Sequence, residues 1–225
     1  MESPSPTTIA VIGGTGQEGQ GLTLRWAAAG HPVIIGSRQR EKAERKAVDL
    51  NARLAGRGHP VIRGLSNREA ADEADVIALV VPYAAQRDIL ADIREAAQRK
   101  VVLTAVVPLD PARAKRILVP PDGSAAAEAQ RILGPETPVA TAFQNAGAHH
   151  LQAWDQPVDC DILVCSDDAD AKSTTMGLIQ ALGMRPLDAG PLVNAVAVEG
   201  LTPILIGLNI KHRARGTGIR VTGLP

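Results

Sequence analysis

The stretch AVIGGTGQEGQGLTLRWAAAGHPVIIGSR, from Ala10 to Arg38, decides the fold. It begins with an apolar run, continues through a glycine-rich turn and a segment of helical period, and ends with a second apolar run. Gly14, Gly16 and Gly19 have the spacing G-x-G-x-x-G between the first apolar run and the helix. This order predicts a strand–turn–helix–strand unit of the kind that binds a dinucleotide.

The glycines of this turn predict a phosphate-binding site. Gly14 permits the tight turn, Gly16 lets the backbone approach a pyrophosphate, and Gly19 lets the helix pack close to the sheet. The helix N-terminus then presents free N–H groups and a positive dipole end to the phosphates. We expect cofactor contacts from the turn and the start of the helix, at Gly14, Thr15, Gly16, Gln17, Glu18 and Gly19. The competing interpretation is a glycine-rich turn that binds nothing.

The end of the second apolar run discriminates between NAD and NADP. An NAD site normally has Asp or Glu here, which accepts a hydrogen bond from the ribose 2′-hydroxyl. This chain has Ser37 and Arg38 instead, and Lys42 follows one helical turn after Arg38. A guanidinium and an ammonium suit a 2′-phosphate. We therefore predict NADP contacts at Ser37, Arg38 and Lys42, against the alternative of an ordinary exposed loop.

Strands and helices alternate through the rest of the chain. This predicts an α/β fold with a Rossmann-type, doubly wound, mostly parallel sheet. We expect residues 1–190 to form the NADP-binding domain. Residues 191–225 are expected to form a small C-terminal element, an apolar helix with a basic tail, packed on the same body or at an oligomer interface. The expected strands cover residues 8–12, 32–36, 61–65, 75–82, 100–108, 138–143, 161–165 and 185–190, and the Pro-rich residues 109–124 are expected to be a loop.

The carboxyl ends of the fourth and fifth strands are expected to contact the ribose and nicotinamide through Val81, Pro82 and Val107. The residues themselves indicate no catalytic set and no metal site. His149 and His150 are either proton donors to a substrate or polar loop residues. Hydride transfer between two stacked rings needs mainly positioning.

The composition excludes other functional classes. Hydrophobic residues make up 45% of the chain and the formal net charge is zero, which argues against a nucleic-acid-binding or membrane-surface protein. Cys160 and Cys165 lie on opposite faces of an expected strand, as structural cysteines of a reducing compartment would. Residues 1–8 lack the regions of a signal peptide, and polar residues and a proline interrupt the apolar segment 191–210. We expect a cytoplasmic protein.

The chain resembles the NADPH-dependent reductases of the deazaflavin coenzyme F420. The resemblance covers almost the whole chain, from IAVIGGTGQEGQGLTLRWAAAGHPVIIGSR through EKA and RPLDAGPL to LTP. It implies reversible hydride transfer between the nicotinamide of NADPH and carbon 5 of the deazaflavin, in a Rossmann-type oligomer that we expect to be a homodimer. It also implies NADP contacts at Thr15, Gly16, Ser37, Arg38 and Lys42, Ala148 between the two rings, Thr202 near the deazaflavin, and backbone of Gly216–Ile219, including Gly218, near its ring.

The chain departs from archaeal members of that family at Gln144, Ala146 and Gly147, where they have a histidine, a larger aliphatic residue and a proline. It also lacks their basic residue near Val196 and their hydroxyl near Gly200. The basic segment 211–220 suits the phosphate and glutamates of the coenzyme, or it is a solvated surface. Two alternative functions are an NADPH-dependent reductase of another acceptor, a flavin or a ferric chelate, and a non-catalytic NADP-sensing protein.

Overall fold

The computed structural model describes residues 6–56 and 58–224. Within them, an eight-stranded sheet has the order β10-β9-β8-β5-β4-β1-β2-β3. Neighbouring strands are parallel except for the antiparallel pair β8 and β9, so the expected Rossmann-type, mostly parallel sheet is confirmed. The strands are β1 (Ile9–Ile12), β2 (Val33–Ser37), β3 (Arg63–Ser66), β4 (Val76–Leu79), β5 (Val101–Thr104), β8 (Val139–Thr141), β9 (Asp161–Ser166) and β10 (Arg185–Asp188).

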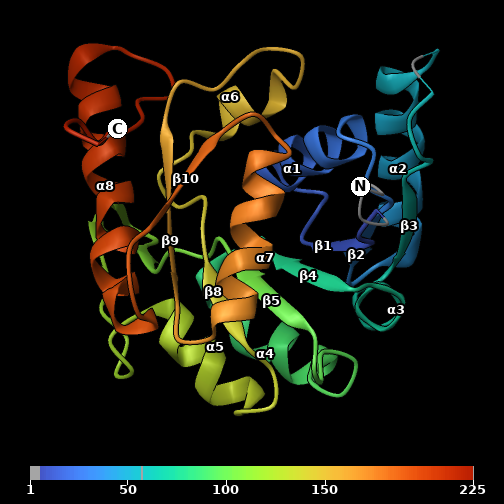
Figure 1. Cartoon of the computed structure of the whole chain (residues 1–225), viewed down its shortest axis with the longest axis horizontal. Coiled ribbons are helices and arrows are strands. Elements are labelled where there is room, and N and C mark those ends of the chain that lie inside the picture. The colour runs from blue at the N-terminus through green and yellow to red at the C-terminus, as the bar shows by residue number, and fades with distance from the viewer. Residues whose placement is uncertain (1–5, 57, 225) are drawn as a thin grey trace.

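Helices cover both faces of the sheet, and Figure 1 shows α1 on one side of the strands and α4 and α5 on the other. They are α1 (Gln17–Ala28), α2 (Arg40–Leu54), α3 (Asn67–Glu73), α4 (Tyr83–Ile93), α5 (Ala125–Leu133), α6 (Ala148–Gln152), α7 (Ala169–Gln180), the 3-10 turn η1 (Leu192–Asn194) and α8 (Ala195–His212).

Strand β1 shows why the chain needs two helical layers. Ile9 and Val11 pack into a core with side chains of α1, α2 and α7. Ala10 and Ile12 point the other way, into a core with side chains of α3, α4 and α5. All four side chains are fully buried, as expected of a central parallel strand whose successive side chains alternate between faces.

Ser66 is the N-cap residue of α3. Ser66 accepts a hydrogen bond from the backbone N–H of Glu69 at 3.3 Å, and Glu69 Oε2 accepts one from the backbone N–H of Ser66 at 3.0 Å. This capping box satisfies two N–H groups at the start of the helix. It fixes the connection between β3 and α3 beside the tip of β2.

The segment expected to be a loop, residues 109–124, contains a small hairpin, so that expectation was wrong. Strands β6 (Leu109–Asp110) and β7 (Arg113–Ile117) pair antiparallel. Asp110 Oδ1 accepts a hydrogen bond from the backbone N–H of Ala112 at 2.9 Å, which closes the turn. Pro108 and Pro111 hid the hairpin in the sequence because proline is uncommon in strands. The short helix α6 was also not predicted from the sequence.

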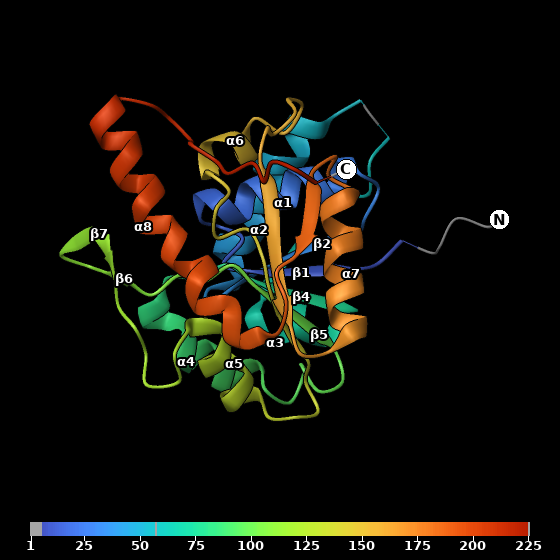
Figure 2. The same ribbon diagram turned by 60° about the vertical axis from the view of Figure 1, so that its left-hand side comes forward.

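The C-terminal segment returns to the sheet after α8 (Figure 2). The backbone N–H of Asp161 in β9 donates to the carbonyl oxygen of Ile219 at 2.8 Å. The buried carboxylate of Asp161 accepts from Arg185 at 2.6 and 2.8 Å and from the backbone N–H of Val221 at 2.7 Å. These hydrogen bonds hold the pKa of Asp161 at about 2. They fasten the tail to the body.

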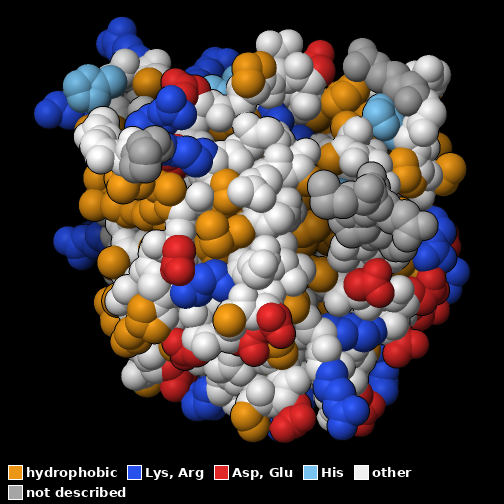
Figure 3. Space-filling model, viewed as in Figure 1, with side chains coloured by type: hydrophobic (Ala, Val, Ile, Leu, Met, Phe, Trp, Pro, Cys, Tyr) orange, Lys and Arg blue, Asp and Glu red, His pale blue; other side chains and the backbone are white. Residues whose placement is uncertain are grey.

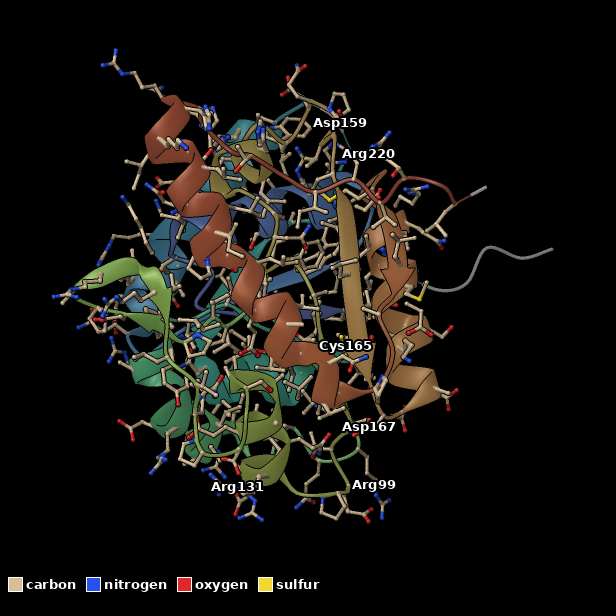
Figure 4. The ribbon with its side chains drawn as sticks, turned by 90° about the vertical axis from the view of Figure 1, so that its left-hand side faces the viewer. Arg99, Arg131, Asp159, Cys165, Asp167 and Arg220 are labelled. Atoms are coloured by element: carbon tan, nitrogen blue, oxygen red, sulfur yellow. The ribbon has the colours of Figure 1, made fainter. Side chains whose placement is uncertain are left out.

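The basic segment 211–220 meets an acidic residue, Asp159, next to the start of β9. Figure 4 shows Asp159 and Arg220 next to each other, and Arg220 Nη1 lies 3.3 Å from the Asp159 carboxylate. At least one cation of the basic segment, Arg220, therefore forms an ion pair within the chain. Cys160 and Cys165 are free and buried, as structural cysteines are.

Helix α8 was expected to be a buried or interface helix. By length and composition alone, Leu192–His212 is long enough and apolar enough to cross a membrane. Yet its fully buried Glu199 accepts hydrogen bonds from the backbone N–H groups of Ala125 and Ala126 at 2.9 and 3.0 Å, which ties α8 to the start of α5. The absence of a signal peptide was expected from residues 1–8, of which residues 1–5 lie outside the described part of the chain.

Candidate functional site

The glycine-rich turn brings backbone very close to a neighbouring strand end. Gly13 has a φ of +88°, and a Cβ atom there would lie 2.1 Å from the carbonyl oxygen of Val80. A Cβ on Gly19 would lie 2.7 Å from both the carbonyl oxygen of Gly13 and the Cα of Gly14. Gly16 precedes α1 without a side-chain cap, so the first N–H groups of α1 face outward without a side-chain acceptor. This is the backbone arrangement that binds phosphate.

A pocket of about 210 Å³, called the β2 pocket here, lies beside this turn at the tip of β2. Arg38 and Lys42 line it, and neither side chain has an ion pair or hydrogen bond with any described residue. Arg40 is different, because its guanidinium bonds Glu44 at 2.9 Å and Glu69 at 2.8 Å. The residues lining the β2 pocket are Gly13, Thr15, Gly16, Gly36, Ser37, Arg38, Lys42, Asn67, Val80, Val81, Pro82, Ala85 and Ile89.

A larger space, called the central cavity here, adjoins the β2 pocket and has a volume of about 510 Å³. The two share Gly16 and the strand end Val80–Pro82 as walls. Most of the central cavity is lined by small or apolar side chains and backbone. Its other lining residues are Gln17, Glu18, Gly19, Ala105, Val107, Leu109, Gln144, Ala146, Gly147, Ala148, His149, Thr202, Ile206, Asn209 and Gly216.

Gln144 lines the central cavity, and its side-chain amide is buried behind the wall. The side chain is only 4% exposed. Its Nε2 donates to the carbonyl oxygen of Thr104 at 2.8 Å and contacts Thr141 Oγ1, while its Oε1 has no partner among the described residues. Thr202 Oγ1 donates to the Gln144 carbonyl oxygen at 2.7 Å, which holds α8 against this wall. This acceptor is buried beneath the surface of the wall, where an unpartnered oxygen is costly.

Two titratable side chains line the central cavity, Glu18 and His149. Glu18 stands in the first turn of α1, and burial of its carboxyl raises the pKa of Glu18 to about 8. His149 is exposed at the start of α6. Its neighbour His150 contacts the Gly216 carbonyl oxygen through Nε2 at 2.6 Å. The described residues hold no group of three or more potential metal ligands.

Comparison with known proteins agrees with this geometry. Residues 8–108 match the family model of coenzyme F420-dependent NADP oxidoreductases. The chain is 44% identical over 221 residues to the F420-dependent NADP reductase of Methanocaldococcus jannaschii, with 96% of this chain and 98% of that protein covered. The chain belongs to the family of F420-dependent NADP reductases. The Methanothermobacter thermautotrophicus enzyme of the same name is 46% identical, with 96% of this chain and 95% of that protein covered.

A solved structure shares the fold of this family member. It comes from Arthrobacter sp. FB24, is described as a candidate F420 dependent NADP-reductase, and superposes with a TM-score of 0.81. The alignment covers 96% of this chain and 99% of the Arthrobacter chain at 23% identity. At that identity, the likeness supports the architecture.

The structure brings most of the sequence-predicted site residues of this reductase-family chain together. Gly14 packs under the turn, where a Cβ atom would lie 2.9 Å from the carbonyl oxygen of Val11. Gly218 lies apart, where a Cβ would lie 2.5 Å from Cys160 Cβ, in a separate space of about 130 Å³. The predicted residues that line the β2 pocket or the central cavity are Thr15, Gly16, Gln17, Glu18, Gly19, Ser37, Arg38, Lys42, Val81, Pro82, Val107, Ala148 and Thr202.

Several wall residues were not predicted from the sequence, among them Gly13, Ile206 and Asn209. Gly13 carries the positive φ of the turn, although the motif drew attention to Gly14. Ile206 and Asn209 of α8 line the central cavity four and seven residues after Thr202. That spacing is helical, so the position of Thr202 contained a usable signal for both.

Proposed function

We propose that the β2 pocket and the central cavity together hold NADPH, with the deazaflavin of coenzyme F420 beside its nicotinamide, and that the protein catalyses reversible hydride transfer between them. The bound substrates supply the hydride chemistry. The chain contributes binding, alignment and exclusion of water. The observation that supports this most is that Gly16 and Val80–Pro82 line both spaces, because a dinucleotide that extends from one to the other must cross these residues.

The β2 pocket supplies the preference for NADP. Arg38 and Lys42 line it without carboxylate partners, so both cations are available to a 2′-phosphate. Ser37 Oγ accepts from the backbone N–H of Gln39 at 3.2 Å, and this bond shapes the loop that carries Arg38. Among the described residues, no acidic side chain lines the pocket to accept a hydrogen bond from an NAD ribose hydroxyl.

The central cavity fits two stacked rings. The small side chain of Ala148 leaves space where we place the nicotinamide and the second ring. Val81, Pro82 and Val107 provide apolar contact. The side chain of Thr202 offers a polar contact to the edge of a flat ligand. These features support the ring placement that the family relation implies.

A stopped-flow experiment tests the function. Protein, NADPH and oxidised coenzyme F420 are mixed, and the loss of deazaflavin absorbance is followed. We expect turnover with NADPH and much slower turnover with NADH. Turnover only with a flavin or a ferric chelate would instead indicate another reductase. NADPH binding without any turnover would indicate a sensing protein.

We also propose that the protein is a cytoplasmic homodimer, in which residues 191–225 form an interface element on a nucleotide-binding domain of residues 1–190. Hydrophobic side chains gather over α8 on the left of Figure 3. The side chains of Val193, Ile204 and Ile210 are 58–71% exposed. Val119, which follows β7 in the sequence, is 64% exposed. A second copy covering this surface would remove it from water. Light scattering on a size-exclusion column would give the dimer mass, and Ile204→Glu would give the monomer mass.

A further inference from the structure

Glu18 is a carboxyl that the hydride-transfer chemistry described above leaves without a role. It stands two residues after Gly16 in the first turn of α1 and lines the central cavity together with Ala148 and Thr202. Its carboxyl has no hydrogen bond or ion pair with any described residue. An unpartnered carboxyl in a ligand cavity is a candidate for proton transfer.

The elements around Glu18 place no cation against it. Arg25, further along α1, is engaged by α6 and its C-terminal loop, with hydrogen bonds of 2.8–3.0 Å to the carbonyl oxygens of His150, Leu151, Ala153 and Gln156. Helix α6 contributes His149 to the cavity. His150 lies behind it, bonded to Gly216.

The remaining described walls of the central cavity carry no charged side chain. Helix α8 contributes Thr202, Ile206 and Asn209, and the ends of β4 and β5 contribute apolar residues. The cations Arg38 and Lys42 line the β2 pocket and not the central cavity. With no cation to stabilise the carboxylate, burial dominates and raises the pKa of Glu18 to about 8. Glu18 is therefore mostly a neutral acid at pH 7, with a proton to give.

We propose that Glu18 donates the proton that accompanies hydride transfer to the deazaflavin and accepts it in the reverse direction. This rests on the proposed function. The C4–H bond of the dihydronicotinamide breaks, and its two electrons and hydrogen form a C–H bond at carbon 5 of the deazaflavin. The O–H bond of Glu18 breaks, and its proton forms an N–H bond on the reduced ring, directly or through one water. A carboxylate, a cationic nicotinamide and a neutral reduced deazaflavin remain, so atoms and charge balance.

The carboxylate formed at Glu18 lies in the same cavity as the nicotinamide that has become cationic. Its negative charge stabilises the cationic product across the cavity. The side chain is half-buried, so solvent reaches it and restores the proton before the next turnover.

The pH dependence of kcat/KM tests the proposal, because this ratio reports the groups of the free enzyme. For reduction of F420 by NADPH, wild type is expected to be flat below about pH 8 and about tenfold slower at pH 9 than at pH 7. Glu18→Gln should lose this inflection and lower kcat about 100-fold at pH 7, the lower end of general acid contributions. Glu18→Asp, which keeps a carboxyl, should restore part of the rate and an inflection.

His149→Gln is the matched control, because His149 is the other titratable side chain of the cavity; it should keep the inflection near pH 8. The proposal fails if Glu18→Gln keeps both the inflection and kcat, if it raises only the KM for NADPH, or if the inflection disappears with His149→Gln. Titration of each variant with NADP+ checks that the nucleotide site is intact. If wild type itself does not reduce F420, the proposed function fails, whereas wild-type turnover with an unchanged Glu18→Gln profile refutes the Glu18 proposal alone.

Discussion

Replacing Arg38 tests how the protein selects its nucleotide. Arg38→Ala removes a cation that has no partner among the described residues, so the change breaks no intramolecular ion pair. A hydrogen bond to a charged group contributes about 1.5–3 kcal/mol, which corresponds to a loss of NADPH affinity of about 10- to 150-fold. Because Lys42 lines the same pocket and keeps one cation, we expect the lower half of this range. NADH, which has no 2′-phosphate, should change less than about threefold.

The charge-reversed variant Arg38→Asp extends the same reasoning. Its carboxylate repels a 2′-phosphate, and it is able to accept a hydrogen bond from the 2′-hydroxyl of NADH, as acidic residues do in NAD sites. We therefore expect a larger loss of NADPH affinity than with alanine and a gain of NADH affinity. Dissociation constants for both nucleotides are measured by the fluorescence of the bound dihydronicotinamide.

Arg40→Ala is the control for these variants. Arg40 is two residues away, but its guanidinium is engaged with Glu44 and Glu69 and lines neither space. It should leave the ratio of NADPH to NADH affinity unchanged. The reasoning is refuted if Arg38→Ala weakens NADPH and NADH equally, or if Arg40→Ala changes the ratio as much as Arg38→Ala does.

Four further variants test other parts of the structure. Gly21→Ala places a Cβ 2.6 Å from Leu151 Cβ and should lower the free energy of unfolding in urea by about 1–3 kcal/mol, whereas Gly177→Ala, in open space on a helix, should raise it by about 0.5–1 kcal/mol. Ala148→Leu fills the ring space, so NADPH should still bind while F420 reduction falls about 100-fold; equal loss of both would contradict the ring placement. Burial raises the pKa of Glu199 to about 7, so its contribution to stability is full below about pH 4.5 and is lost as pH rises through 7. Thermal unfolding of Glu199→Gln should lose that part of the pH dependence, and an unchanged curve would count against it.

The local pattern of the sequence predicted the nucleotide half of the molecule well. The G-x-G-x-x-G spacing and the cations after the second strand act over a few residues, so their spacing alone shows where they lie. The structure places Gly16, Arg38 and Lys42 together in the β2 pocket, and their contacts with NADP stay a prediction. The role of Gly13 was hidden, because its need for glycine comes from Val80, which is distant in sequence.

The second half was harder to predict because tertiary contacts decide it. The Arg185–Asp161 pair joins residues 24 positions apart and fixes the tail through Val221. No local pattern contains that contact. The fastened tail also brings Gly218 beside Cys160, and its approach to the deazaflavin ring stays a prediction. Gln144 Oε1 likewise has no partner because the amide nitrogen faces Thr104. The sequence alone does not predict this orientation of the amide.

Transfer of deuterium tests the central claim most directly, namely that one cavity holds both rings in contact. The protein is mixed with oxidised F420 and with NADPH that carries deuterium at C4, separately in each of the two stereochemical positions. For one of the two positions, the account predicts that the deuterium appears undiluted at carbon 5 of the reduced deazaflavin, in ordinary water. Reduced deazaflavin that carries only solvent hydrogen at carbon 5 with both labelled forms would contradict direct transfer between rings in the central cavity.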